Sequence, residues 1–268
     1  MAAVIGIARI AGEPGSSKAK LQQFRKVTIA HPYLVAARDR LITAISDSPR
    51  NSVIFVLGPT GVGKTTLRAK VENDLTARLI PELREDRGRM PVVGMEAVAP
   101  DTGNFSWRDH FKRLLDSMRE PLIDYKLDRK GRPRGDKEYL FRFDPSARSS
   151  GAEHQYAVEE ALRYRRPAAV FIDEAQHLAK MSSGRRLLDQ LDVIKSIANC
   201  TDTPHVLVGT YDLLAFRNLS GQLSRRSIDI HFRRYRADRP GEASIFINVL
   251  RSFAAQLPVA KHADLVKD

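Results

Sequence analysis

The chain has almost no cysteine and no long hydrophobic run, and each shortage excludes a class of protein. Cys200 is the only cysteine in 268 residues, so an intrachain disulfide or a zinc site built from cysteines cannot form. No apolar run approaches the roughly 20 residues that span a bilayer. The apolar run Val4–Ile7 is too short for a signal peptide and lacks its basic lead. We therefore expect a cytoplasmic protein, in a reducing setting, that makes no membrane contact.

Positive charge is in excess. Lys and Arg number 44 against 32 Asp and Glu, which gives a net charge of +12 and a pI of about 10.0. This balance favours a polyanionic partner, most often nucleic acid, although charge kept for solubility is an alternative. An apolar fraction of 43% is ample for a core. The length suits one large domain, or a domain with a small appendage.

Residues 57–65 contain the phosphate-loop motif G-x-x-x-x-G-K-T. The apolar run 52–57 before it predicts a buried parallel strand, and residues 66–75 after it predict a helix. Glycines let the backbone approach a phosphate, which accepts N–H bonds at the helix N-terminus. Lys64 would contact the β and γ oxygens, and the Thr65 hydroxyl would ligate Mg²⁺. The expected ATP contacts are Gly58, Pro59, Thr60, Gly61, Val62, Gly63, Lys64, Thr65 and Thr66.

A second nucleotide motif ends in Asp173 and Glu174. The apolar residues 168–172 before them predict a buried strand, which delivers both carboxylates to the edge where open α/β sheets bind ligands. Asp173 would contact the nucleotide through Mg²⁺, and Glu174 would polarise the water that attacks the γ-phosphate. The predicted strand 205–210 ends in Thr210. This residue would face the γ-phosphate or the water, or would simply cap the next helix.

Strand and helix patterns alternate along the rest of the chain. Further strands are predicted at 91–97 and 227–232, and further helices near 31–45, 105–118, 152–165, 185–198 and 242–256. The helix after the phosphate loop should end near Pro81. The alternation predicts an α/β fold with a mostly parallel five-stranded sheet flanked by helices. Residues 1–26 predict a flexible N-terminal arm.

Basic residues gather at two places. The predicted helix 105–118 carries Arg108 and Lys112 on the side opposite its apolar residues. Two alternating runs around a turn predict a β-hairpin near 123–145. Its tip carries Lys126, Arg129, Lys130, Arg132 and Arg134. For this tip, a solvated loop and a contact with nucleic acid or a partner are equally good interpretations.

The ordered set of motifs resembles the AAA+ ATPases. The resemblance implies that Thr210 is the residue called sensor 1, and that Arg225 or Arg226, just before the last strand, is an arginine finger. A finger neutralises charge on the γ-phosphoryl bound to a neighbouring subunit, so the resemblance implies a homo-oligomer. A surface ion pair or a DNA contact is the alternative role of these two arginines.

Residues 172–178 and 206–214 more narrowly resemble the AAA+ regulators of DNA transposition, the TnsC/TniB type. The resemblance covers about residues 28–257. It implies an ATP-dependent ring or helical filament on double-stranded DNA that links a target-selection protein to a transposase. ATP hydrolysis would reset or dismantle the assembly. Because the helix after the second strand contacts the DNA backbone in such proteins, Arg108 is the first DNA candidate, Lys112 the next, and the hairpin tip a secondary one.

The same resemblance divides the chain into the arm, an AAA+ core over residues 27–238 with the hairpin as an insertion, and the start of a helical lid over 239–268. There is room for one helix after Pro240. We therefore expect a reduced or truncated lid, and we assign no second sensor arginine.

Several other functions share the nucleotide chemistry. A helicase loader or replication initiator, also AAA+, would differ only in its partner. A helicase needs two motor domains, for which 268 residues leave little room. A small-molecule kinase would need an acceptor pocket and would not need the positive charge. A module that switches with ATP without hydrolysing it would not need Glu174.

Overall fold

The computed structural model describes residues 21–22, 24, 28–99, 105–121, 123, 151–179, 184–214 and 227–257. The chain forms two compact units, one of residues 1–36 with 233–268 and one of residues 37–232. Apart from residue 123, the predicted hairpin near 123–145 lies outside the described residues, and so does nearly all of the predicted arm. None of the described helices is long and apolar enough to cross a bilayer.

The larger unit is built on a five-stranded sheet. Its strands are β1 (Val53–Leu57), β2 (Val93–Glu96), β3 (Val170–Asp173), β4 (His205–Gly209) and β5 (Ser227–His231). Their order is β2-β3-β4-β1-β5, and all four pairings are parallel. Every residue of β1, β3 and β4 is buried, as expected of parallel strands covered on both faces. The predicted α/β fold with five strands is confirmed.

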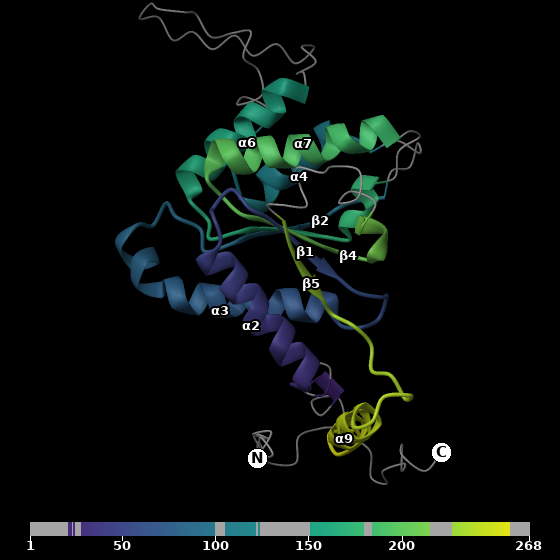
Figure 1. Cartoon of the computed structure of the whole chain (residues 1–268). Coiled ribbons are helices and arrows are strands. Elements are labelled where there is room, and N and C mark those ends of the chain that lie inside the picture. The colour runs from purple at the N-terminus through teal and green to yellow at the C-terminus, as the bar shows by residue number, and fades with distance from the viewer. Residues whose placement is uncertain are drawn as a thin grey trace, which may run out of the picture. The chain divides into compact units, whose positions relative to one another are not determined.

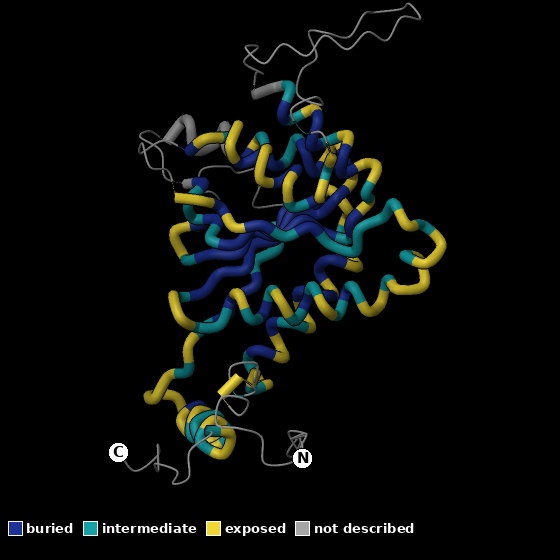
Figure 2. Tube along the Cα trace, turned by 180° about the vertical axis from the view of Figure 1, so that it is seen from behind, coloured by how far each residue is buried: buried dark blue, intermediate teal, exposed yellow. Residues whose placement is uncertain are grey.

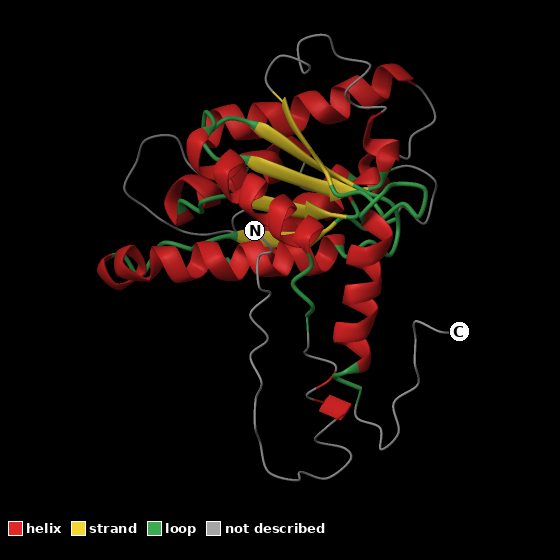
Figure 3. Cartoon of the chain, turned by 60° about the horizontal axis from the view of Figure 1, so that its bottom comes forward, coloured by secondary structure: helices red, strands yellow, loops and turns green. Residues whose placement is uncertain are grey.

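Helices cover both faces of this sheet (Figures 1 and 3). One face carries α4 (Trp107–Ser117), α6 (Gly151–Arg165) and α7 (Gly184–Thr201). The other carries α3 (Lys64–Glu85) and, within this unit, residues 37–47 of α2 (Pro32–Asp47). Two short 3₁₀ helices, η1 (Ala175–Ala179) and η2 (Tyr211–Leu213), follow β3 and β4. The buried residues concentrate in the sheet and on the helix sides that face it (Figure 2).

The predicted apolar side of α4 explains its position. Phe111, Leu114 and Leu115 share one side of the helix and are at most 2% exposed, in a core that also contains Phe55 and Ile172. The helix begins where the Ser106 hydroxyl accepts a hydrogen bond from the Asp109 backbone N–H, which satisfies one amide of the first turn.

Helix α3 is longer than predicted. It continues through Pro81 to Glu85, so the expectation that it ends near Pro81 is wrong. Proline removes the hydrogen bond to the carbonyl four residues earlier, that of Ala77. Both Pro81 and Ala77 are exposed, so water can satisfy that carbonyl and the helix can continue.

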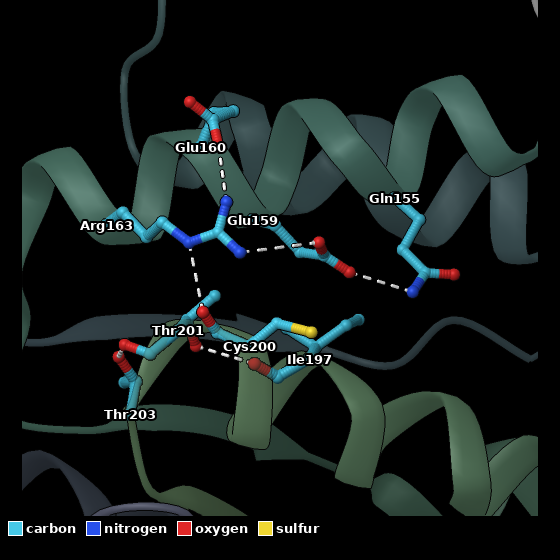
Figure 4. Close-up of polar contacts among 8 residues, drawn as sticks. All are labelled: Gln155, Glu159, Glu160, Arg163, Ile197, Cys200, Thr201 and Thr203. Carbon is cyan, nitrogen blue, oxygen red and sulfur yellow. Dashed lines mark hydrogen bonds and ion pairs between the residues drawn. The ribbon is translucent and has the colours of Figure 1, made fainter.

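Arg163 links α6 to the end of α7 (Figure 4). Its Nε donates to the Cys200 carbonyl at 3.0 Å, and its guanidinium also pairs with Glu159 and Glu160. A cation at a helix C-terminus satisfies a terminal carbonyl and interacts favourably with the helix dipole. This contact fixes the chain just before β4.

The smaller unit contains helix α9 (Glu242–Ala254). Glu242, the first residue of this helix, is buried and accepts hydrogen bonds from its surroundings. The Glu242 carboxylate accepts hydrogen bonds from the Arg233 side chain at 2.8 Å and from the Arg236 backbone N–H at 2.9 Å. Arg233 lies over the ring of Tyr33, which stacks on Tyr235 with 4.4 Å between ring centroids. One described helix does not establish the predicted lid, which stays a prediction.

Candidate nucleotide-binding site

The loop between β1 and α3 has the backbone that a phosphate site needs. Gly61 and Gly63 have φ values of 79° and 99°, which glycine adopts without strain. The helix begins at once with Lys64, so the N–H groups of its first turn lack intrahelical acceptors and are available to a phosphate. Gly58 has no room for a side chain, because a Cβ there would lie 2.4 Å from the carbonyl oxygen of Phe232, the residue after β5.

Lys64 supplies positive charge inside this loop. Lys64 is only 6% exposed. Its ammonium donates to the carbonyl oxygens of Gly58 at 3.1 Å and Pro59 at 3.0 Å. The ammonium is therefore already held against the loop backbone and removed from water. Phosphate oxygens could replace these two carbonyls as acceptors without a further desolvation cost for the lysine.

Asp173 ends β3 as a buried carboxylate. Its Oδ1 accepts from the Glu174 backbone N–H at 2.9 Å, and its Oδ2 lies 3.5 Å from Nη1 of Arg68, whose Nε also pairs with Glu72 at 2.7 Å. The side chain of Asp173 is 4% exposed and that of Arg68 is 18% exposed. A buried carboxylate needs such a partner, because its charge is costly to remove from water.

These groups fit a Mg²⁺–nucleotide complex. Mg²⁺ prefers oxygen ligands and usually combines one or two protein groups with phosphate oxygens and water. Thr65 is an exposed residue in the first turn of α3, and Asp173 ends β3 at the same edge of the parallel sheet. Thr65 and Asp173 would hold the ion.

Glu174 has a constrained backbone and a tethered side chain. Its φ is 49°, in the left-handed region that non-glycine residues seldom occupy. Its Oε2 accepts a hydrogen bond from the side-chain amide of Gln176, and the Oε1 of Gln176 accepts from the Thr210 backbone N–H at 3.2 Å. Gln176 therefore joins the carboxylate after β3 to the backbone after β4.

Thr210 stands at the N-terminal end of the short helix η2. It precedes η2, but its side chain makes no capping hydrogen bond to that helix. Its hydroxyl instead bonds Oδ2 of Asp212 at 2.9 Å. The sensor role of Thr210 stays a prediction.

The sheet brings most of the predicted nucleotide residues together. Loop 58–66, Asp173 with Glu174, and Thr210 follow β1, β3 and β4, which are neighbours in the sheet. The Gly58 N–H donates to the Gly209 carbonyl at 3.1 Å, which ties the loop directly to the end of β4. The predicted finger residues Arg225 and Arg226 lie outside the described residues.

The predicted DNA residues lie elsewhere. Arg108 and Lys112 are exposed on α4, next to an ion pair between Arg113 and Asp109 at 2.6 Å. The hairpin-tip residues Lys126, Arg129, Lys130, Arg132 and Arg134 are not among the described residues.

Sequence reasoning missed the roles of Arg68, Gln176 and Gly209. Arg68 follows Lys64 by one helical turn and so shares its helix face, which was a usable signal. Gln176 stands beside the Asp-Glu pair, but its contact with Thr210 depends on how the two strands pair. Gly209 leaves room for this contact, because a Cβ there would lie 2.4 Å from Oε1 of Gln176 and would displace the amide.

Comparison with known families agrees with this site. The profile of the AAA domain family matches residues 48–216, well over half of the chain, from before β1 to just after η2. The chain belongs to the AAA domain family. The fold and the site together support a nucleotide-hydrolysing ATPase, and the expected AAA+ fold is confirmed. No curated protein matches the chain.

Solved structures give the fold alone, because their sequences are distant. The ORC2 protein of Aeropyrum pernix, in ADPNP and ADP complexes, has a TM-score of 0.50 and 15% identity over 84% of this chain and 51% of its own. The Walker-type ATPase PABY2304 of Pyrococcus abyssi scores 0.49 with 14% identity, covering 81% and 56%. Cdc6p of Pyrobaculum aerophilum scores 0.45 with 15% identity, covering 92% and 52%. The chain thus spans about half the length of these structures.

Proposed function

We propose that this ATPase acts on duplex DNA as an oligomer and regulates transposition. In this proposal it assembles on the DNA with ATP, connects a target-selection protein to a transposase in the cytoplasm, and hydrolyses ATP to reset or dismantle the assembly. One observation supports the ATP-dependent part of this proposal: the phosphate loop, Asp173 with Glu174, and Thr210 all lie at the same edge of the sheet.

Each residue has a chemical role in hydrolysis. Loop N–H groups and Lys64 would bind and orient the phosphates, and Glu174 would take up the proton of the attacking water. Bound Mg²⁺ would neutralise charge on the phosphate oxygens. An arginine of a neighbouring subunit, Arg225 or Arg226, would complete the site, so a lone subunit should turn over slowly.

The basic face of α4 is the proposed DNA contact. Its exposed Arg108 and Lys112 and the net charge of +12 support binding to backbone phosphates. Contacts to phosphates carry no sequence information, so binding should tolerate different sequences. The hairpin tip is a second candidate contact.

The transposition role rests on the resemblance of residues 172–178 and 206–214 to TnsC/TniB-type regulators. The similarity in fold to the ORC2 protein favours a second candidate, a replication-initiator or helicase-loader role with the same ATP chemistry. The two candidates differ in partner. Stimulation of a transposase would favour the first, and loading of a helicase ring the second.

Salt-dependent DNA binding tests the contact with α4. We would measure the affinity of the wild type, of the Arg108→Ala/Lys112→Ala double variant and of a control for a labelled duplex, with an ATP analogue, across a salt series. The control, Arg84→Ala/Arg87→Ala, removes the same charge from exposed positions in the last turn of α3 and just after it. Each lost phosphate contact should reduce the slope of log K against log salt by about 0.9.

The α4 variant should therefore lose about 1.8 in slope per subunit, and the control should lose little. Equal losses in the two variants would refute the α4 contact. Electron microscopy of the wild type with duplex and the ATP analogue should show a ring or a filament. Single subunits under those conditions would refute the proposed assembly.

A further inference from the structure

Gln176 is the one side chain in the described part of the site that bonds both the proposed general base and the backbone of the neighbouring strand end. Its Nε2 donates to Oε2 of Glu174, and its Oε1 accepts from the Thr210 N–H at 3.2 Å. A carboxylate can only accept hydrogen bonds and a backbone N–H can only donate. A primary amide can satisfy both at once, in one orientation.

Few other side chains can replace glutamine here. Glutamate keeps an acceptor for Thr210 but has no donor for Glu174. Asparagine has both groups on a side chain that is one methylene shorter, and methionine has similar length but no N–H donor. The space for the amide comes from Gly209, since a Cβ there would lie 2.4 Å from Oε1 of Gln176.

The backbone of Glu174 is fixed independently of its side chain. Its N–H donates to Asp173 and its carbonyl accepts from the His177 N–H, both at 2.9 Å. These bonds maintain the φ of 49° and so fix where the side chain leaves the backbone. The direction of the carboxylate is then set by the one described hydrogen bond at its end, the bond from Gln176.

We propose that Gln176 is a positioning residue for ATP hydrolysis: its amide couples the direction of the Glu174 carboxylate to the backbone at Thr210. This inference rests on the ATPase part of the proposed function and is independent of DNA and transposition. A general base works only within hydrogen-bond reach of the proton it removes. Loss of the Gln176 bond would let the carboxylate rotate away from the water without changing the groups that bind the nucleotide.

Kinetics of the Gln176→Met variant test the coupling. We expect kcat to fall about tenfold, the effect of losing one hydrogen bond to a charged group, while affinity for an ATP analogue stays within about twofold. In a Glu174→Gln background the same substitution should have no further effect on kcat, because Gln176 acts through Glu174. An unchanged or raised kcat, or a full tenfold loss in that background, would overturn the proposal.

The Gln176→Glu variant tests the donor side of the amide separately. It keeps an acceptor for the Thr210 N–H but places a second carboxylate beside Glu174, and like charges repel. We therefore expect kcat to fall at least as far as in Gln176→Met, while affinity for an ATP analogue stays within about twofold. A Gln176→Glu variant with wild-type kcat would overturn the proposal.

Amide hydrogen exchange tests the contact without turnover. In the nucleotide-free protein, the Thr210 amide should exchange faster in Gln176→Met than in the wild type, whereas amides within β1 should not change. A Thr210 amide with unchanged exchange would overturn the proposal even if the wild type proved inactive. Absence of wild-type ATP hydrolysis, with and without duplex, would instead refute the proposed function.

Discussion

Two buried histidines should make the larger unit unstable in mild acid. His110 on α4 and His205 at the start of β4 are 3% and 2% exposed. The pKa of each imidazole is lowered from 6.5 to about 4, chiefly by burial. For His110, the charge of His205 also lowers the pKa and the charge of Asp109 raises it. For His205, a hydrogen bond to the Thr203 carbonyl raises the pKa. Nδ1 of His110 has no hydrogen-bond partner among the described residues, so no acceptor there stabilises a proton.

The direction of the effect follows from proton binding. Between pH 6.5 and 4 the unfolded chain binds more protons at these two sites than the folded chain. The free energy of unfolding is therefore fully retained above pH 6.5 and falls as the pH drops toward 4. At pH 5 each site should lower it by about 2 kcal/mol relative to pH 8, or about 4 kcal/mol together. For a unit of this size that is a drop of about 8–16 °C in Tm.

Urea unfolding at a series of pH values between 8 and 5 would measure this loss. We expect His110→Phe, whose ring can pack against Phe105 and Phe111, to remove about half of the pH dependence. The control is His231→Gln, because His231 is exposed and water already solvates its ring. If His110→Phe loses as much stability from pH 8 to pH 5 as the wild type does, the reasoning is refuted.

Four substitutions test the site itself. Lys64→Ala should abolish binding of a fluorescent ATP analogue and ATP-dependent assembly; unchanged affinity would reject the phosphate-loop assignment. Glu174→Gln should retain ATP binding but lower hydrolysis by about 10²-fold or more and trap the oligomer on DNA, so wild-type turnover would exclude Glu174 from the mechanism. Gly58→Ala forces a Cβ against the Phe232 carbonyl and should lower the free energy of unfolding by about 1–3 kcal/mol, as measured in urea. Arg68→Ala leaves the buried carboxylate of Asp173 without its guanidinium partner and should lower the free energy of unfolding by about 2 kcal/mol. Mg²⁺ with nucleotide should restore part of this loss. A variant as stable as the wild type would contradict the pairing.

Much of the fold could be predicted because its signals are local. Apart from Asp173 and His205 at strand ends, the residues of β1, β3 and β4 are apolar or glycine, as suits strands buried on both faces, and the side-chain pattern of α4 identified its buried side. The phosphate loop was identifiable because its glycines and Lys64 lie within a few residues of one another. Pro81 led to a wrong prediction of where α3 ends. Proline usually ends a helix, but the carbonyl that loses its hydrogen bond here is on an exposed residue, so water can satisfy it and the helix continues.

The amino-acid sequence by itself determined the strands and helices, the α/β class and the groups that would contact a phosphate, because each depends on neighbours along the chain. The tertiary structure alone decided that β4 lies between β1 and β3 and that β5 pairs with β1. It thereby decided the contacts of Arg68 with Asp173, of Gln176 with Thr210 and of Gly58 with Phe232. Each of these contacts joins residues that are far apart in sequence. Which of them meet is set by the order in which buried strands pair, and a pattern read along one segment does not contain that order.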